Sequence, residues 1–331
     1  MSINKKVLVS GYLGFGNFGD EAMFEALCMF LQSLQMNVRA LCDKDNYSVK
    51  TYKRTDIIPA ILASDIVISG GGSLLQNKTS NESLMYYLSI IFLAKLLGRK
   101  VMIYAQGIEP IKGDFYQTLT KLALKMANFV SVRDAHSFRL LKSWNIKCTY
   151  MSDPVYALLQ DIEPSAKKNG LIVQLRPVKG VTSTFISGLA ESIAKHYKGE
   201  ITVLALQKDM DEPICAKFTK ELNKHNLQAN YFHFGKSVEE IIDVINNAKY
   251  VISTRLHGIT VASALGSQVL AIPYDEKVKN FALENKIQTL DLFKADRVAI
   301  EKAIEKFFST EAEPQEKKRF VWDDFYEAIR K

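Results

Sequence analysis

Short apolar runs alternate with amphipathic helical stretches along almost the whole chain, and this alternation constrains the fold more than any other feature. The runs are rich in β-branched residues and apolar throughout, which is typical of strands covered on both faces of a parallel sheet. Helices between such strands supply the long connections that parallel strands require. The pattern therefore predicts an α/β protein with doubly wound parallel sheets.

The alternation falls into two series. The first predicts strands at 6–12, 37–43, 65–72, 100–107, 129–134 and 147–153. The second predicts strands at 171–177, 201–207, 229–234, 250–257 and 268–275. We expect two Rossmann-like domains, 1–160 and 171–308, joined by the polar linker 161–170, with a ligand-binding cleft between them. We expect residues 309–331 to form a charged tail and an amphipathic helix that packs back on the body.

Composition excludes several classes of protein. With 331 residues, 47% hydrophobic and 24% charged, the chain can bury two cores and is neither disordered nor fibrous. No secretory signal opens it, and its longest apolar stretch, 84–97, is shorter than the roughly 20 residues of a membrane span. Its cysteines are scattered without metal-binding spacing, which indicates reduced thiols; they are Cys28, Cys42, Cys148 and Cys215. We expect a cytoplasmic protein without a metal site.

A formal net charge of +7 favours an anionic partner. Nucleic acid, anionic lipid headgroups and a polyanionic small substrate all fit this sign. No block of consecutive basic residues with interleaved aromatics occurs, so we expect no nucleic-acid binding.

A glycine-rich segment follows the first predicted strand. Residues 14–19 satisfy GxGxxG, and Asp43 ends the second strand, as in a dinucleotide site. However, Asp20 and Glu21 stand at the helix start, where a pyrophosphate would have to lie. A glycine turn with an acidic helix cap explains the segment without a dinucleotide.

Other strand ends of the first domain also carry polar residues. The run SGGGS at 69–73 contains three glycines whose N–H groups could converge on an anion. Gln106 and then Arg133 follow the next two strands. For Arg133, a buried ion pair within the domain is an equally good interpretation.

The second domain contains the cluster of basic residues that most strongly indicates a binding site. The segment STRLHG at 253–258 places Arg255 and His257 at the end of one strand, and Lys277 follows the next. These three side chains suit a small ligand that carries carboxylate and phosphate groups. The remaining histidines lack such partners and are interpreted as structural or surface residues; they are His136, His196, His225 and His233.

Seven motifs occur in series: GYLGFGNFGDEA, SGGGSLLQ, QGIEP, RDAHSFRLL, SDPVYAL, STRLHGITVASALG and YDEKV. Together they resemble the polysaccharide pyruvyl transferase family, most closely its CsaB type, which modifies bacterial cell-wall polymers. The resemblance implies a GT-B-like fold of two Rossmann-like domains. It also implies transfer of a pyruvyl group from phosphoenolpyruvate to two hydroxyls of a sugar, forming a cyclic ketal and releasing phosphate. The implied acceptor is a lipid-linked saccharide, which would bring a cytoplasmic protein into peripheral contact with the anionic inner face of the membrane.

Carried over to this sequence, the resemblance implies that Arg133, Arg255, His257 and Lys277 hold phosphoenolpyruvate, the donor substrate, without a cofactor. An imidazole titrates near neutral pH, so His257 is the candidate for proton delivery. A carboxylate among Asp20, Glu21 and Asp153 is the alternative acid or base. The catalytic candidates are His257, Arg255, Asp20 and Glu21. The substrate-binding candidates are Arg133, Lys277, Gly14, Gly16, Asn17, Gly71, Gly72, Ser73, Gln106, Asp153 and Ser253.

Glu109 departs from the family pattern, which commonly has glycine in the corresponding turn, and this departure bears on which acceptor is bound.

Two other functions stay open. A GT-B glycosyltransferase with a nucleotide-sugar donor needs similar glycine loops and basic residues. A non-catalytic module that binds anionic glycans needs the basic residues alone.

Overall fold

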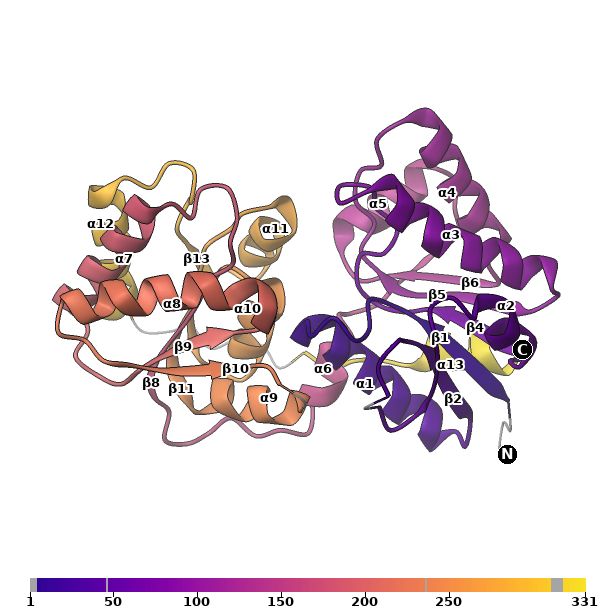
Figure 1. Ribbon diagram of the computed structural model, residues 1–331, viewed down its shortest axis with the longest axis horizontal. Coiled ribbons are helices and arrows are strands. Elements are labelled where there is room, and N and C mark those ends of the chain that lie inside the picture. Colours follow the sequence, from indigo (N-terminus) through magenta and orange to yellow (C-terminus); the bar gives the residue numbers. More distant parts are fainter. Residues whose placement is uncertain (1–4, 46, 236, 311–317) are drawn as a thin grey trace. The chain divides into compact units, whose positions relative to one another are not determined.

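The computed structural model describes residues 5–45, 47–235, 237–310 and 318–331, which form two compact units (Figure 1). Unit 1 contains Gly19–Gln160, Arg319–Lys331 and the described part of Met1–Phe15. Unit 2 contains Gly16–Phe18 and the described part of Asp161–Lys318. The α/β class and the two parallel sheets predicted from the sequence are confirmed.

The described residues of unit 1 form a seven-stranded parallel sheet with strand order β3-β2-β1-β4-β5-β6-β7. Its strands are β1 (Lys6–Ser10), β2 (Asn37–Leu41), β3 (Lys50–Tyr52), β4 (Ile66–Ser69), β5 (Lys100–Gln106), β6 (Phe129–Val132) and β7 (Thr149–Tyr150). The connecting helices are α1 (Phe18–Ser33), α2 (Ile57–Leu62), α3 (Asn81–Leu96), α4 (Asp114–Met126), α5 (Ala135–Ser143) and α6 (Val155–Leu159). Because every pair is parallel, the carboxyl ends of all these strands lie along one edge of the sheet.

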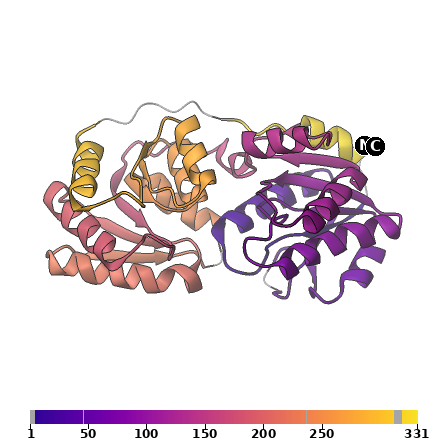
Figure 2. The same cartoon turned by 90° about the horizontal axis from the view of Figure 1, so that it is seen from above.

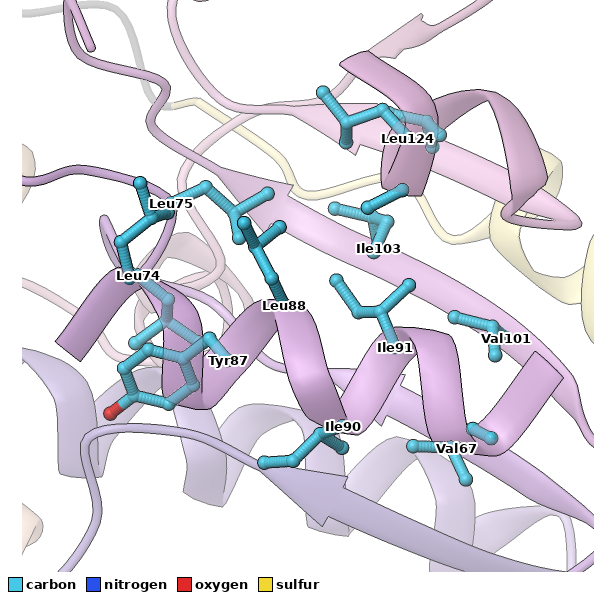
Figure 3. Close-up of a cluster of buried hydrophobic side chains, with 14 of the residues drawn as sticks. Val67, Leu74, Leu75, Tyr87, Leu88, Ile90, Ile91, Val101, Ile103 and Leu124 are labelled. Atoms are coloured by element: carbon cyan, nitrogen blue, oxygen red, sulfur yellow. The ribbon is translucent and has the colours of Figure 1, made fainter. Parts of the chain in front are cut away.

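The core of unit 1 lies between the sheet and α3. Leu88 and Ile91 of α3 pack with Val101 and Ile103 of β5 and with Leu124 of α4 (Figure 3). All five side chains are almost completely buried. The apolar stretch 84–97 is therefore a core helix, as its length predicts.

The C-terminal helix α13 (Asp323–Arg330) packs within unit 1 and is drawn in yellow in Figure 2. Its Phe325 lies 5.0 Å from Tyr104 of β5 between ring centroids, and the preceding Trp322 stacks on Phe30 of α1 at 3.9 Å. The Lys100 ammonium donates to the carbonyl of Ala328 at the end of the helix. Strand β5 is thus covered by α3 on one face and by α13 on the other.

Unit 2 repeats the design with a six-stranded parallel sheet in its described residues, in the order β10-β9-β8-β11-β12-β13. The strands are β8 (Asn169–Gln174), β9 (Ile201–Ala205), β10 (Ala229–His233), β11 (Ala248–Ser253), β12 (Gln268–Ala271) and β13 (Gln288–Thr289). The helices are α7 (Ser183–His196), α8 (Lys208–Lys224), α9 (Val238–Asn247), α10 (Leu256–Ala264), α11 (Glu276–Glu284) and α12 (Arg297–Ser309). Helices α7, α8 and α12 share one buried core with the sheet, while Figure 1 shows α9 on the opposite side of the strands from α8.

The boundaries of the units differ from the predicted ones at two places. Residues 16–18 belong to unit 2, because the Phe18 N–H donates to Leu206 O at 2.9 Å and its ring meets Phe234 edge-on. The predicted linker 161–170 is shorter than expected, since β8 already begins at Asn169. Within the predicted tail 309–331, residues 311–317 lie outside the described part of the chain.

Every predicted strand ends earlier than expected. Strand β1 stops at Ser10, β4 at Ser69 and β11 at Ser253. The polar and glycine residues that follow leave the sheet and form the loops at its carboxyl edge. These loops hold the candidate residues.

Candidate functional site

In unit 1, Glu21 anchors the glycine turn that follows β1. The Gly14 N–H donates to Glu21 Oε1 at 2.8 Å, and the Tyr47 hydroxyl donates to Oε2 at 2.6 Å. Gly14 has φ +81° and lies so close to Cys42 that a Cβ would be 2.6 Å from its sulfur. Burial raises the pKa of Glu21, while the hydrogen bonds from Tyr47 and Gly14 act in the opposite direction. Because both carboxylate oxygens are engaged in these contacts, Glu21 holds the turn in place.

The three glycines after β4 make room for α1. A Cβ on Gly71 would lie 3.0 Å from Met23 Sδ, and one on Gly72 would lie 2.7 Å from Asp20 Oδ1. Gly72 also has φ +107°, which only glycine adopts without strain. The proximity of the Asp20 carboxylate disfavours an anion at Gly72. Close packing therefore explains why glycine stands at Gly71 and Gly72, while anion binding by the SGGGS run stays a prediction.

Gln106 connects the loops after β4 and β5. Its fully buried side chain donates to Gly70 O and accepts from the Leu74 N–H at 3.2 Å. The next residue, Gly107, donates its N–H to Gly72 O at 2.7 Å, and a Cβ there would lie 2.6 Å from Ser73 Oγ. Gln106 thus shapes the loop that carries Ser73.

Glu109, the departure from the family pattern, is almost fully buried and forms an ion pair with Lys78. This pair joins the turn after β5 to the segment that leads into α3. The carboxylate therefore has a structural partner within unit 1.

Arg133 follows β6 and forms a buried ion pair. Its Nη1 lies 2.6 Å from Asp153 Oδ2, and the two side chains are 7% and 10% exposed. The same nitrogen is 2.8 Å from Met23 Sδ. Asp134, the neighbour in sequence, instead caps α5 by accepting from the Ser137 N–H. The ion pair within unit 1, one of the two interpretations of Arg133, is present, and its partner is Asp153.

In unit 2, Gln174 at the end of β8 organises the segment after β11. Its Oε1 accepts hydrogen bonds from the Ser253 hydroxyl at 2.9 Å and the Arg255 N–H at 2.9 Å. A third bond comes from the Thr254 hydroxyl at 3.2 Å. Ser253 is fully buried and belongs to this support.

The Arg255 guanidinium is held by a carboxylate of its own unit. Nε donates to Asp211 Oδ2 at 2.8 Å and Nη2 donates to Oδ1 at 2.6 Å. Nη2 also donates to Gln207 Oε1 at 3.1 Å. Arg255 is 7% exposed and Asp211 is 0% exposed. This pairing holds the STRLHG segment in position, while the catalytic role expected for Arg255 stays a prediction.

His257 and Lys277 occupy corresponding positions in two adjacent helices. His257 is half-buried in the first turn of α10, and Lys277 is half-buried in the first turn of α11. The helix start that carries Lys277 is fixed by Asp275, whose side chain accepts from the Val278 N–H at 3.0 Å. The carboxyl edge of unit 2 therefore presents an imidazole and an ammonium from neighbouring strand ends.

Sequence reasoning missed one cation at this edge. Arg176 follows β8, and its Nη1 donates to the Tyr274 hydroxyl at 2.8 Å. Burial and the charge of Asp275 raise the pKa of Tyr274, whereas Arg176 and Arg255 lower it. The signal was present in the sequence, because Arg176 stands two residues after the end of an apolar strand, as Arg255 does.

The candidate residues thus fall into two groups. Unit 1 contains Gly14, Asp20, Glu21, Gly71, Gly72, Ser73, Gln106, Arg133 and Asp153. Unit 2 contains Gly16, Asn17, Ser253, Arg255, His257 and Lys277. Across the described residues, no three His, Cys, Asp or Glu side chains are grouped to bind a metal ion. In the same part of the chain, no helix has both the length and the apolar character to cross a bilayer.

Solved structures show the same fold. UDP-GlcNAc 2-epimerase from Methanocaldococcus jannaschii superposes with a TM-score of 0.66 at 11% identity, over 98% of this chain and 98% of that chain. The enzyme from Neisseria meningitidis, solved bound to UDP-GlcNAc, gives 0.63 at 11% identity over 98% and 99%. At such identities the likeness shows the GT-B-like fold alone. A comparison with curated proteins gives no match.

The family model for polysaccharide pyruvyl transferase matches residues 17–276, which include Arg133, Arg255 and His257 and end one residue before Lys277. The match covers most of the chain and both units. The chain is a transferase that belongs to the polysaccharide pyruvyl transferase family.

Proposed function

We propose that this protein transfers a pyruvyl group from phosphoenolpyruvate to two hydroxyls of a sugar in a lipid-linked precursor of a cell-wall or surface polysaccharide. The observation that carries the proposal is the placement of His257 and Lys277 in the first turns of α10 and α11, at adjacent strand ends of one sheet. An ammonium attracts phosphate and carboxylate, and a helix amino terminus also favours an anion. An imidazole is a common general acid or base in enzymes. An ammonium and an imidazole at two helix amino termini suit phosphoenolpyruvate, which has to be bound and then protonated.

The reaction sets the requirements on these residues. Protonation of the donor's methylene carbon makes C2 electrophilic, and one sugar hydroxyl adds to it. The C2–O bond to phosphate then breaks, and the second hydroxyl forms the second C–O bond of the ketal. Of the two hydroxyl protons released, one balances the proton gained by the methyl carbon and the other leaves on hydrogen phosphate. The enzyme must therefore provide one acid, one base and positive charge for the leaving phosphate.

His257 is our candidate for the acid, and Lys277 for the charge that stabilises the leaving phosphate. Among the carboxylates considered, Glu21 is engaged at both oxygens and Asp153 is paired with Arg133. Asp20 is half-buried beside Gly72. Asp20 and Asp153 stay candidates for the base that takes a proton from a sugar hydroxyl.

For the acceptor, we propose a lipid-linked saccharide of the kind implied by resemblance to the CsaB type. The formal net charge of +7 suits peripheral contact with an anionic membrane surface. No resident cofactor is needed, because phosphoenolpyruvate itself carries the group that is transferred.

The proposal is tested by incubating the full chain with a lipid-linked saccharide and either phosphoenolpyruvate or a UDP-sugar. Release of phosphate, together with a pyruvyl ketal on the acceptor by mass spectrometry, is the expected result. Release of UDP with a glycosylated acceptor would replace the proposal with the glycosyltransferase alternative. Binding of acceptors without turnover on either donor would favour a non-catalytic module.

A further inference from the structure

We propose that Arg176 and Tyr274 form an oxyanion-binding subsite at the carboxyl edge of unit 2. In this subsite Arg176, in place of Arg255, is the arginine of the unit that pairs with the donor's phosphate or carboxylate. The inference rests on the proposed function, since it names the group that holds the donor. It adds a residue that sequence reasoning did not assign.

The subsite lies at the end of β11. Arg176 comes two residues after Gln174, the last residue of β8, and Tyr274 comes three residues after Ala271, the last residue of β12. Strand β11 lies between β8 and β12 in the sheet. The hydrogen bond from Arg176 Nη1 to Tyr274 therefore reaches across the strand end from which the STRLHG segment departs.

The two arginines at this edge differ in what neutralises them. Arg255 donates twice to Asp211, which is completely buried, so an incoming anion would have to compete with an ion pair already formed. Arg176 has a neutral phenol as its hydrogen-bond partner. Within the described residues, no carboxylate oxygen lies within ion-pair distance of its guanidinium. Of the two arginines, Arg176 is therefore the one whose positive charge no carboxylate of the described residues neutralises.

Arg176 also has an unmet hydrogen-bonding requirement. Its Nε is buried and has no hydrogen-bond acceptor within the described part of the chain. Leaving a buried donor without an acceptor costs free energy, which an oxyanion contributed by a ligand would recover. The adjacent nitrogens of a guanidinium match the two oxygens of a phosphate or carboxylate.

Tyr274 orients the guanidinium. The Arg176 Cζ lies 5.3 Å from the centre of the Tyr274 ring, within the range of a cation–π contact, and the hydroxyl fixes Nη1. The nearest acidic neighbour in sequence, Asp275, directs Oδ1 to the start of α11. Tyr274 is thus a positioning residue, and Arg176 is the binding residue.

The test compares binding with turnover in the full chain. Titration calorimetry with phosphoenolpyruvate, inorganic phosphate and pyruvate, and steady-state kinetics of phosphate release, are performed on the wild type and three variants. The variants are Arg176→Ala, Arg176→Lys and Tyr274→Phe. We expect Arg176→Ala to weaken phosphoenolpyruvate binding about tenfold or more, because a charge-assisted pair is lost. Arg176→Lys keeps the positive charge but loses the paired N–H donors of the guanidinium, so it should bind phosphoenolpyruvate better than Arg176→Ala and more weakly than the wild type. Tyr274→Phe keeps the ring and loses the hydroxyl, so it raises KM for the donor severalfold and leaves kcat nearly unchanged.

The matched control is Lys249→Ala. Lys249 is also a cation over a tyrosine ring, at 5.1 Å from the centre of Tyr250, but it lies near the start of β11 instead of its end. Its removal leaves donor binding unchanged.

Inorganic phosphate and pyruvate show which group of the donor, its phosphate or its carboxylate, binds to Arg176. Loss of phosphate binding in Arg176→Ala assigns the subsite to the phosphate group, and loss of pyruvate binding assigns it to the carboxylate. Wild-type affinity of a folded Arg176→Ala for all three ligands overturns the subsite, even where pyruvyl transfer by the wild type establishes the function. Phosphate or pyruvate binding that depends on Arg176, in a protein that transfers no pyruvyl group, overturns the proposed function and leaves the subsite standing.

Discussion

Arg255 and Asp211 form a doubly hydrogen-bonded ion pair in unit 2, with Nε 2.8 Å from one carboxylate oxygen and Nη2 2.6 Å from the other. Asp211 Oδ2 also accepts the N–H groups of Leu206 and Gln207 at 3.1 Å each. One buried carboxylate therefore joins the loop after β9 to the segment that carries His257. This arrangement assigns the pair to the support of the site.

Asp211→Ala should destabilise the protein by about 3–5 kcal/mol, because it leaves the buried Arg255 charge without a partner. Chemical denaturation of the variant and the wild type measures the difference. Glu221→Ala is the control, since Glu221 pairs with the exposed Lys224 and such pairs contribute little to stability. Equal unfolding curves for Asp211→Ala and Glu221→Ala would contradict the supporting role.

His257→Ala should lower kcat for pyruvyl transfer roughly a hundredfold or more, as expected for the loss of a general acid. The fold should be retained, because His257 is half-buried in the first turn of α10. Phosphate release at saturating phosphoenolpyruvate gives kcat, and circular dichroism checks the fold. His225→Ala, at the C-terminal cap of α8, is the matched control and should keep full activity. Turnover near the wild-type value in His257→Ala would remove His257 from the mechanism.

Lys277→Ala should act mainly on donor binding. Loss of an ammonium that pairs with phosphate or carboxylate is expected to raise KM for phosphoenolpyruvate roughly tenfold and to change kcat less. Lys279→Ala removes a lysine two positions further along α11, which is 56% exposed and 3.7 Å from Glu276. Steady-state kinetics should show an unchanged KM for this control. The same KM in both variants would exclude Lys277 from the donor site.

We predict that Glu21 makes the free energy of unfolding depend on pH. Burial raises its pKa in the folded chain above the usual 4.5. A carboxyl group of this kind stabilises the folded state below its unfolded pKa, and the contribution is lost as the pH rises through the folded pKa. The free energy of unfolding of the wild type, relative to Glu21→Gln, should therefore fall as the pH rises above 4.5.

Denaturation series at acidic and neutral pH for both proteins measure this trend. The exposed Glu305 supplies the control, because the difference between the wild type and Glu305→Gln should vary little with pH. A wild-type advantage over Glu21→Gln that grows toward neutral pH would show that the folded chain favours the ionised carboxylate.

Much of the fold was predictable, since an apolar β-branched run is a local property of the sequence. Strands β1, β2, β5 and β6 begin at the predicted residues. The short strands β3 and β13 were not predicted. Strand β13 has two residues, and it is defined by pairing with β12, which no local pattern encodes.

The candidate site was predictable in its location but not in its pairings. Residues that follow parallel strands must lie at the carboxyl edge of a sheet, so Arg133, His257 and Lys277 could be placed there in advance. The partner of Arg133 is Asp153, twenty positions further along the chain, and the partner of Arg255 is Asp211. Neither partner lies beside its arginine in the sequence.

The amino-acid sequence by itself determined the α/β class, the alternation of most strands with helices, and most of the polar residues that follow the strands. The tertiary structure alone decided which of these charges are neutralised within the protein. An ion pair requires two side chains from separate segments to meet within hydrogen-bond distance, and that depends on how the loops pack. The alternation of apolar runs therefore predicted where Arg255 lies, while the fold brought Asp211 to Arg255 and the hydroxyl of Tyr274 to Arg176.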